Sequence, residues 1–201
     1  MRREWLSGAE LLAKLRPRYF FTHLGPAMRK LTLLRTMSGA QHYEHAGRIE
    51  GTVRIDGEAY DVKGFGQRDH SWGVRDMRVP ANWRWFSGQF GDQLCFNAIK
   101  VEVLGLRASG GYVYHDGKVE ALTGWSYDAE SPAPRQGPRR LKLDLACGSG
   151  KRFALTGTAL TDIPVIALTG GYASIVNEAH TRFVCGDKVG HGVSEFMEQL
   201  I

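Results

Sequence analysis

The side chains best suited to chemistry lie in one stretch, residues 64–76, which reads Gly-Phe-Gly-Gln-Arg-Asp-His-Ser-Trp-Gly-Val-Arg-Asp. In an extended strand, successive side chains point to opposite faces. One face would then carry Arg68, His70 and Trp72. The other would carry Gln67, Asp69 and Ser71. An acid or imidazole next to an aromatic ring can transfer a proton to a bound ligand. Polar groups so placed can equally well satisfy one another.

Two further groups of residues offer acids and imidazoles. Glu178 and His180 lie two positions apart in a predicted strand and share a face, where they could act as general acid and base or pair with arginines of neighbouring strands. His42 and His45 lie three positions apart, which is not a helical zinc-protease spacing and makes the rings diverge on a strand. We therefore predict no metal site.

Glycine motifs indicate no cofactor. Gly64-Phe65-Gly66 is followed neither by a third glycine at the dinucleotide-binding spacing nor by a helical pattern. The net charge of +5 is modest and scattered, so we expect no nucleic-acid partner.

The composition favours one domain built from short strands. The chain has 201 residues, is 43% hydrophobic and contains 25 glycines, which suits tight turns better than a helical bundle. Its 3 cysteines match neither a disulfide framework nor a zinc motif. The sequence shows no signal peptide and no apolar run of membrane-spanning length, so we expect a cytoplasmic protein.

Residues 1–40 differ from the remainder and are predicted to be a partly helical segment or connector. Residues 10–16 have helical composition after the possible N-cap Ser7, and Pro17 ends the pattern. Residues 27–37 form a second, basic amphipathic candidate. Such a helix can lie on a membrane surface or pack on its own domain.

Residues 41–201 are predicted to be an all-β domain, because the hydrophobic period changes to two. Asp56-Gly57 and the residues 115–118 are strong hairpin-turn signals. The predicted strands are 48–55, 58–63, 83–90, 93–103, 112–114, 119–125, 141–146, 152–158, 165–169, 172–184 and 188–195. Pro164 is expected to place the start of 165–169 at an edge or bend. About 8–10 antiparallel strands can close into a barrel that encloses one small ligand.

Three stretches also carry a family resemblance. They are residues 64–76, with the core Asp69-His70-x-Trp72-Gly73, residues 43–51, and the ending from Val176-Asn177-Glu178 to residues 192–195. Together they resemble bacterial lipocalin-like proteins related to hydroxyneurosporene synthase, a carotenoid hydratase. The resemblance spans about 42–196.

The resemblance implies a pair of consecutive lipocalin-like barrels, of which this chain matches the second. We therefore expect it to stand alone, to associate as a homo-oligomer or to use a companion barrel. Relatives include hydratases of isoprenoid double bonds, flavonoid hydratases and cyclases of polyketide or terpenoid chains. The resemblance thus implies a hydrophobic small-molecule ligand, but similarity of fold does not establish the reaction.

Two hypotheses follow for function. In the first, the protein is a cofactor-independent hydratase, isomerase or cyclase, in which Asp69 or His70 donates a proton and Glu178 positions water. Arg68 or Arg75 would tune the donor's pKa. The predicted ligand-binding residues are Arg68, Trp72, Arg75, Trp83, Trp85 and His180. In the second, the barrel is a non-catalytic carrier, and Asp69 and His70 anchor the strand.

Overall fold

A computed structural model describes residues 41–73, 80–103, 105–169 and 171–200. This part of the chain consists of antiparallel strands joined by turns and loops. The helices predicted within 1–40, and Arg75, lie outside the described residues. Among the residues that the structure describes, no helix is long and apolar enough to cross a membrane.

The described residues form β1 to β10. Their bounds are β1 Gln41–Ile55, β2 Glu58–Trp72, β3 Pro80–Gln89, β4 Leu94–Val103, β5 Leu106–His115, β6 Lys118–Glu130, β7 Arg140–Cys147, β8 Arg152–Thr169, β9 Tyr172–Cys185 and β10 Lys188–Gln199.

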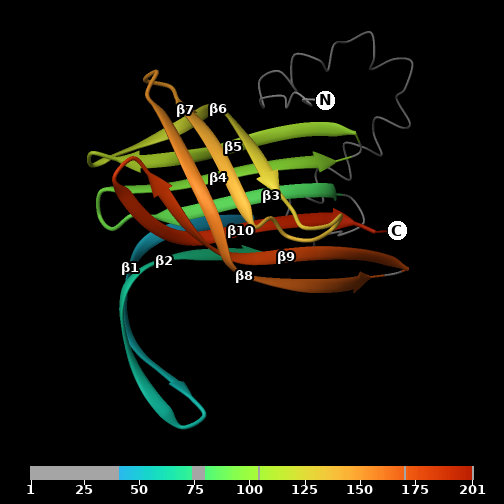
Figure 1. Cartoon of the computed structure of the whole chain (residues 1–201), viewed down its shortest axis with the longest axis horizontal. Helices are drawn as coiled ribbons and strands as arrows, with labels where there is room; N and C mark the ends of the chain where they lie inside the picture. The colour runs from blue at the N-terminus through green and yellow to red at the C-terminus, as the bar shows by residue number, and fades with distance from the viewer. Residues whose placement is uncertain (1–40, 74–79, 104, 170, 201) are drawn as a thin grey trace.

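Eight of these strands close into a barrel in the order β10-β3-β4-β5-β6-β7-β8-β9. β1 and β2 form a separate two-stranded hairpin, whose tip curves away from the barrel (Figure 1). The predicted all-β antiparallel barrel is confirmed. The strand that carries the 64–76 motif is extended as expected, but it belongs to the hairpin and not to the barrel wall.

Alternation along the strands explains why the barrel closes. In β7, Leu141, Leu143 and Leu145 are buried, while Lys142 and Asp144 between them are exposed. This period of two places one face on the core and the other in solvent. Asp56-Gly57 and Asp116-Gly117 have positive φ at both residues, as the predicted tight hairpin turns require.

β8 is one continuous strand of 18 residues, although the sequence predicted two shorter ones. Pro164 lies within it and is paired with Asn177 of β9. The pairing of β8 with β7 covers only Arg152–Thr158, so the other edge of β8 is unpaired around Pro164. A proline on that edge removes no ladder hydrogen bond, which is why the strand continues.

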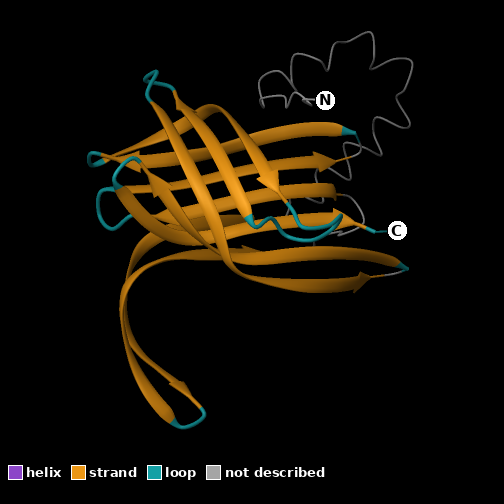
Figure 2. Ribbon diagram, viewed as in Figure 1, coloured by secondary structure: helices purple, strands orange, loops and turns teal. Residues whose placement is uncertain are grey.

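One end of the barrel is filled by side chains. The turns β3–β4, β5–β6, β7–β8 and β9–β10 lie at this end, and the long β6–β7 loop lies at the other (Figure 2). Phe96 and Phe183 meet edge to face there, with ring centroids 5.2 Å apart. A Cβ added at Gly88 would lie 2.5 Å from the Phe96 ring, so the glycine is needed for this packing. Any internal site must therefore open at the other end.

Candidate functional site

A cavity of about 1660 Å³ lies at the open end of the barrel and is itself open to solvent. Residues of the strands and of the loop 131–136 line it, and most of these residues are polar. The aromatic rings of Trp125, Tyr127 and Phe196 form an apolar floor, which we call the aromatic floor, and charged side chains lie around it. The residues used below are Arg84, Lys100, Glu102, Trp125, Tyr127, Phe196 and Glu198.

The aromatic floor is a connected cluster. Phe86, at the base, contacts Trp125 and Phe196 with ring centroids 5.7 and 5.5 Å apart. Tyr127 lies 6.0 Å from both Trp125 and Phe196. Such edge-to-face packing holds the rings in place, and the exposed parts of the rings offer an apolar surface to a guest.

Lys100 brings a cation into this aromatic environment. Its side chain is only 3% exposed, and its Nζ donates a hydrogen bond of 2.6 Å to the carbonyl oxygen of Trp125. The same Nζ lies 4.2 Å from the centroid of the Trp125 ring. Burial lowers the pKa of Lys100 to about 8, because removal from water disfavours the charged amine.

Arg84 lies beside Lys100 in the adjacent strand, and the two residues are register partners. Its Nη1 donates to the carbonyl oxygens of Trp83 and Met197, and its Nη2 contacts Glu198 Oε1 at 2.6 Å. The guanidinium lies over the Phe196 ring at 4.7 Å. Its buried Nε has no hydrogen-bond partner among the described residues.

The sequence analysis missed Lys100 and Arg84. β4 reads Leu94-Cys-Phe-Asn-Ala-Ile-Lys100-Val-Glu102, and Lys100 falls on the same alternating positions as the buried Leu94, Phe96 and Ala98. A lysine on the apolar face of a predicted strand is the signal that could have identified it. Arg84 likewise shares the inward parity of Phe86.

The hairpin presents the first face of the motif to solvent. Arg68, His70 and Trp72 share this face, as predicted, and all three are exposed. Tyr43 lies among them, with its ring 5.4 Å from His70 and 6.0 Å from Trp72. Arg68 Nη2 lies 3.0 Å from His70 Nδ1. These residues lie outside the barrel cavity, and their predicted roles stay predictions.

The second face of the motif contacts the barrel exterior. Glu44 and Asp69 are register partners on this face. Glu44 Oε2 accepts hydrogen bonds from the amides of Gln67, at 2.6 Å, and of Asn97 in β4. Burial raises the pKa of Glu44. The indole of Trp85 lies close enough to the Glu44 carboxylate to favour its ionised form, which opposes this rise in pKa. The indole Nε1 nevertheless forms no hydrogen bond of standard geometry with a described residue.

Two more carboxylates lie on the same outer side of the barrel. Glu178 of β9 and Glu195 of β10 are register partners, and Trp83 Nε1 donates to Glu195 Oε1. Burial raises the pKa of Glu195 to about 8, and the hydrogen bond and charge of Glu178 add to the shift. The charge of Asp69 contributes in the same direction. A carboxyl with this pKa is protonated at neutral pH and can donate a proton.

The structure therefore brings together only part of the predicted site. Asp69, Glu178, Trp83 and Trp85 meet where the hairpin crosses the barrel, and we call this group, with Glu44 and Glu195, the acidic cluster. His180 lies on the same strand face as Glu178, and its ring is 5.6 Å from that of His191.

Among the described residues, one trio could offer ligands to a metal ion. The ligand atoms of His42, Glu44 and Asp69 all lie within 4.8 Å of one another. His42 Nε2 lies 2.9 Å from Asp69 Oδ1 and 3.6 Å from Glu44 Oε1. The His42–His45 pair considered from the sequence is divided between the two faces of β1.

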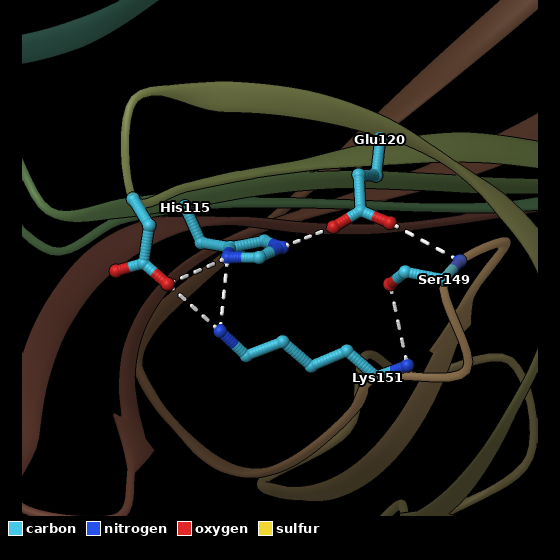
Figure 3. Close-up of polar contacts among 5 residues, drawn as sticks. His115, Glu120, Ser149 and Lys151 are labelled. Atoms are coloured by element: carbon cyan, nitrogen blue, oxygen red, sulfur yellow. Dashed lines mark hydrogen bonds and ion pairs between the residues drawn. The ribbon is translucent and has the colours of Figure 1, made fainter.

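A separate polar cluster joins two turns at the packed end of the barrel (Figure 3). His115 Nε2 lies 2.5 Å from Glu120 Oε1, and Lys151 Nζ lies 2.9 Å from Asp116 Oδ2. The Ser149 amide donates to Glu120 and lowers its pKa, and the Lys151 hydrogen bond lowers the pKa of Asp116. His115 packs on Phe153, with ring centroids 5.1 Å apart. The cluster ties β5–β6 to β7–β8, which makes its role structural.

Comparisons with known proteins agree with this architecture. No curated protein matches the sequence significantly. A solved structure of a Nitrosomonas europaea protein, described only provisionally as AttH, is 18% identical with a TM-score of 0.59. The match covers 78% of this chain and 51% of that one, so this chain spans about half the length of its structural relative. At this identity the likeness shows the fold alone.

A family model gives a more direct assignment. The model described as "Domain of unknown function (DUF7064)" matches residues 14–200, which is nearly the whole chain. On this evidence the chain belongs to the DUF7064 family.

Proposed function

We propose that the protein binds an apolar small molecule, such as a terpenoid, polyketide or lipid-like chain, in the cavity at the open end of the barrel. One observation carries the proposal: a cavity of about 1660 Å³ rests on the rings of Trp125, Tyr127 and Phe196. Ligand sites in proteins are typically concave and aromatic, with a few polar groups that orient the guest. The resemblance to hydroxyneurosporene synthase relatives supports the ligand class.

The aromatic floor supplies the binding free energy. Burial of about 200 Å² of apolar ligand surface contributes roughly 5 kcal/mol at about 25 cal/mol per Å². Part of this is offset by the lost freedom of the ligand. Because roughly 5 kcal/mol alone corresponds to a Kd of about 0.2 mM, we expect submillimolar affinity or weaker for a purely apolar guest.

A cavity-filling variant tests this proposal. Ala129 lines the cavity, whereas Val119 is 68% exposed near the opposite end of β6. With farnesol as the probe, native mass spectrometry and tryptophan fluorescence should show binding to the wild type. Ala129→Trp should weaken binding at least tenfold, and the matched Val119→Trp should not. Ser109→Trp, at a second lining position, repeats the test if Ala129→Trp fails to fold. Equal affinity in all variants would rule out the cavity as the site.

A second candidate function is acid-catalysed hydration, isomerisation or cyclisation of an unsaturated ligand. The observation that favours it is the raised pKa of Glu195, next to the indole of Trp83. In the hydration, the Glu195 proton adds to one alkene carbon. Water then adds to the other carbon and loses a proton to Glu178, from which Glu195 is reprotonated. The faces of Trp83 and Trp85 would stabilise the developing positive charge. In this proposal Glu195 takes the donor role that the sequence analysis gave to Asp69 or His70.

Product analysis distinguishes this enzyme from the carrier. The protein is incubated with an isoprenoid polyene, and products are identified by mass spectrometry. If the acidic cluster is catalytic, Glu195→Gln and Glu178→Gln should abolish turnover. Asp69→Asn and His70→Ala test the roles predicted from the sequence. Recovery of the unchanged polyene would support the carrier, and equal turnover by all variants would remove these residues from the chemistry.

We also propose that the protein works in the reducing cytoplasm with a second barrel as its partner. Cys95, Cys147 and Cys185 are free thiols, and Cys95 and Cys147 are buried. The chain spans about half the length of its structural relative, and Ile49, Val53 and Tyr60 of the hairpin are about half exposed. Light scattering that shows only monomers would argue against association with a second copy.

A further inference from the structure

We infer that the ligand in the barrel cavity carries a carboxylate, which binds between Arg84 and Lys100 while the apolar part of the ligand lies on the aromatic floor. This inference rests on the proposed small-molecule binding and names the chemical class of its ligand, an amphiphilic acid.

The two cations lie directly opposite each other in the barrel wall. Arg84 and Lys100 are direct register partners in β3 and β4, and both line the cavity. Directly opposed residues have Cβ atoms about 4.5–5.5 Å apart, and like charges so placed are destabilising. An anion placed between the two side chains would contact both cations, in addition to the ion pair that Arg84 already forms with Glu198.

Arg84 retains one buried donor that no acceptor among the described residues satisfies. Glu198 and two backbone carbonyls occupy Nη1 and Nη2, whereas the buried Nε has no acceptor within the described part of the chain. A buried donor without a partner is costly. A carboxylate oxygen at Nε would satisfy it without displacing Glu198.

Both cations lie against aromatic rings of the cavity floor. Lys100 Nζ lies 4.2 Å from the Trp125 centroid and 5.7 Å from the Tyr127 centroid, and the Arg84 guanidinium lies 4.7 Å from the Phe196 centroid. The charged end and the apolar surface of the cavity are therefore in direct contact. A ligand that uses both has its acid joined to its apolar body by a short link.

Two carboxylates near the pair form ion pairs with arginines. Glu102 accepts a hydrogen bond of 3.1 Å from Arg107 Nε, and Glu198 contacts Arg84 Nη2. Burial that lowers the pKa of Lys100 to about 8 still leaves this amine mostly charged at pH 7. A bound carboxylate would favour the charged amine further.

The test compares two probes that differ in one group, farnesoic acid and farnesol. By calorimetry at pH 7 and low salt, the wild type should bind the acid at least tenfold more tightly than the alcohol. Lys100→Met should reduce that preference at least fivefold and leave farnesol affinity unchanged or improved. Lys118→Met, at the exposed first residue of β6, should behave as the wild type. Equal affinity for acid and alcohol in the wild type would overturn the inference but leave the proposed function intact, whereas no binding of either probe would overturn both.

A measurement on the wild type alone covers the case in which Lys100→Met does not fold. The preference for farnesoic acid should fall as pH rises above about 8, because Lys100 then loses its charge. A preference that stays constant to pH 10.5 would contradict the role of Lys100. Arg84→Lys, which keeps the charge but lacks Nε, should also reduce the preference.

Discussion

The cavity of the barrel and the acidic cluster outside it are built from the same strands, yet their chemistry differs. β3 directs Arg84 inward and Trp83 and Trp85 outward, and β10 directs Phe196 inward and Glu195 outward. Cations over aromatic rings therefore face the interior, and carboxylates beside indoles face the hairpin. The alternation of a strand is enough to place two chemically different sites on the two sides of one wall.

In both regions burial favours the neutral form of an ionisable side chain, a base in the cavity and an acid in the acidic cluster. It lowers the pKa of Lys100 to about 8 and raises that of Glu195 to about 8. In each case the neutral form is favoured because the charged form loses water. The regions differ in what covers them. Strands and the loop 131–136 line the cavity, which is open to solvent, whereas a two-stranded hairpin that stands partly in solvent covers the acidic cluster.

The largest expected effect separates the barrel core from the hairpin. Phe183 is fully buried and contacts Phe96, so Phe183→Ala should cost about 3–5 kcal/mol of unfolding free energy. Tyr43 is 37% exposed, and Tyr43→Ala should cost less than about 1 kcal/mol. Urea unfolding measures both. Similar losses would mean that the hairpin contributes to the core as much as the barrel interior does.

The interior cation should make stability increase at alkaline pH. Lys100 has a folded pKa of about 8 against an ordinary value of 10.5, so below pH 8 the folded state carries a constant cost. That cost disappears as pH rises from 8 to 10.5, a gain of about 2–3 kcal/mol. Lys100→Met should remove the rise and stabilise the protein at pH 7. Lys118→Met, as the matched control, should retain it.

Glu195, the carboxyl on the outside of the barrel, should make the free energy of unfolding fall as pH rises. The folded pKa of Glu195 is raised from 4.5 to about 8. The stabilisation that the protonated Glu195 carboxyl gives the folded state is therefore fully present below pH 4.5 and is lost as pH rises through 8. We expect a loss of about 1–3 kcal/mol over this range. The difference in unfolding free energy between wild type and Glu195→Gln isolates it. Glu50→Gln, at an exposed hairpin position, should show no such dependence, and a flat difference for Glu195→Gln would refute the raised pKa.

The smallest expected effect concerns the attachment of the hairpin. Asn97 is 4% exposed and donates to Glu44, so Asn97→Ala should cost about 1–2 kcal/mol, mostly as local opening of the hairpin. Hydrogen exchange should speed up in β1 and β2 and remain slow in β7. Arg48→Ala removes an exposed ion pair with Asp92 and should cost less than about 1 kcal/mol. Faster exchange throughout the barrel after Asn97→Ala would show that the two regions are not separable.

Local patterns determined which residues form strands and which share a face. The turns at Asp56-Gly57 and Asp116-Gly117 and the division of 67–72 between two faces were all predictable, because they depend on backbone geometry within a few residues. Lys100 could also have been noticed, since its alternating position needs no knowledge of the fold.

Only the tertiary structure decided which faces meet. It placed the motif strand in a hairpin outside the barrel, set Arg84 opposite Lys100, and brought the charge of Asp69 to Glu195 across more than a hundred residues of chain. Pairing between distant strands depends on the closure of the whole barrel, in which each register is set by the packing of all the others. A pattern of period two states that a strand has two sides, but only the closed barrel determines which side faces the cavity.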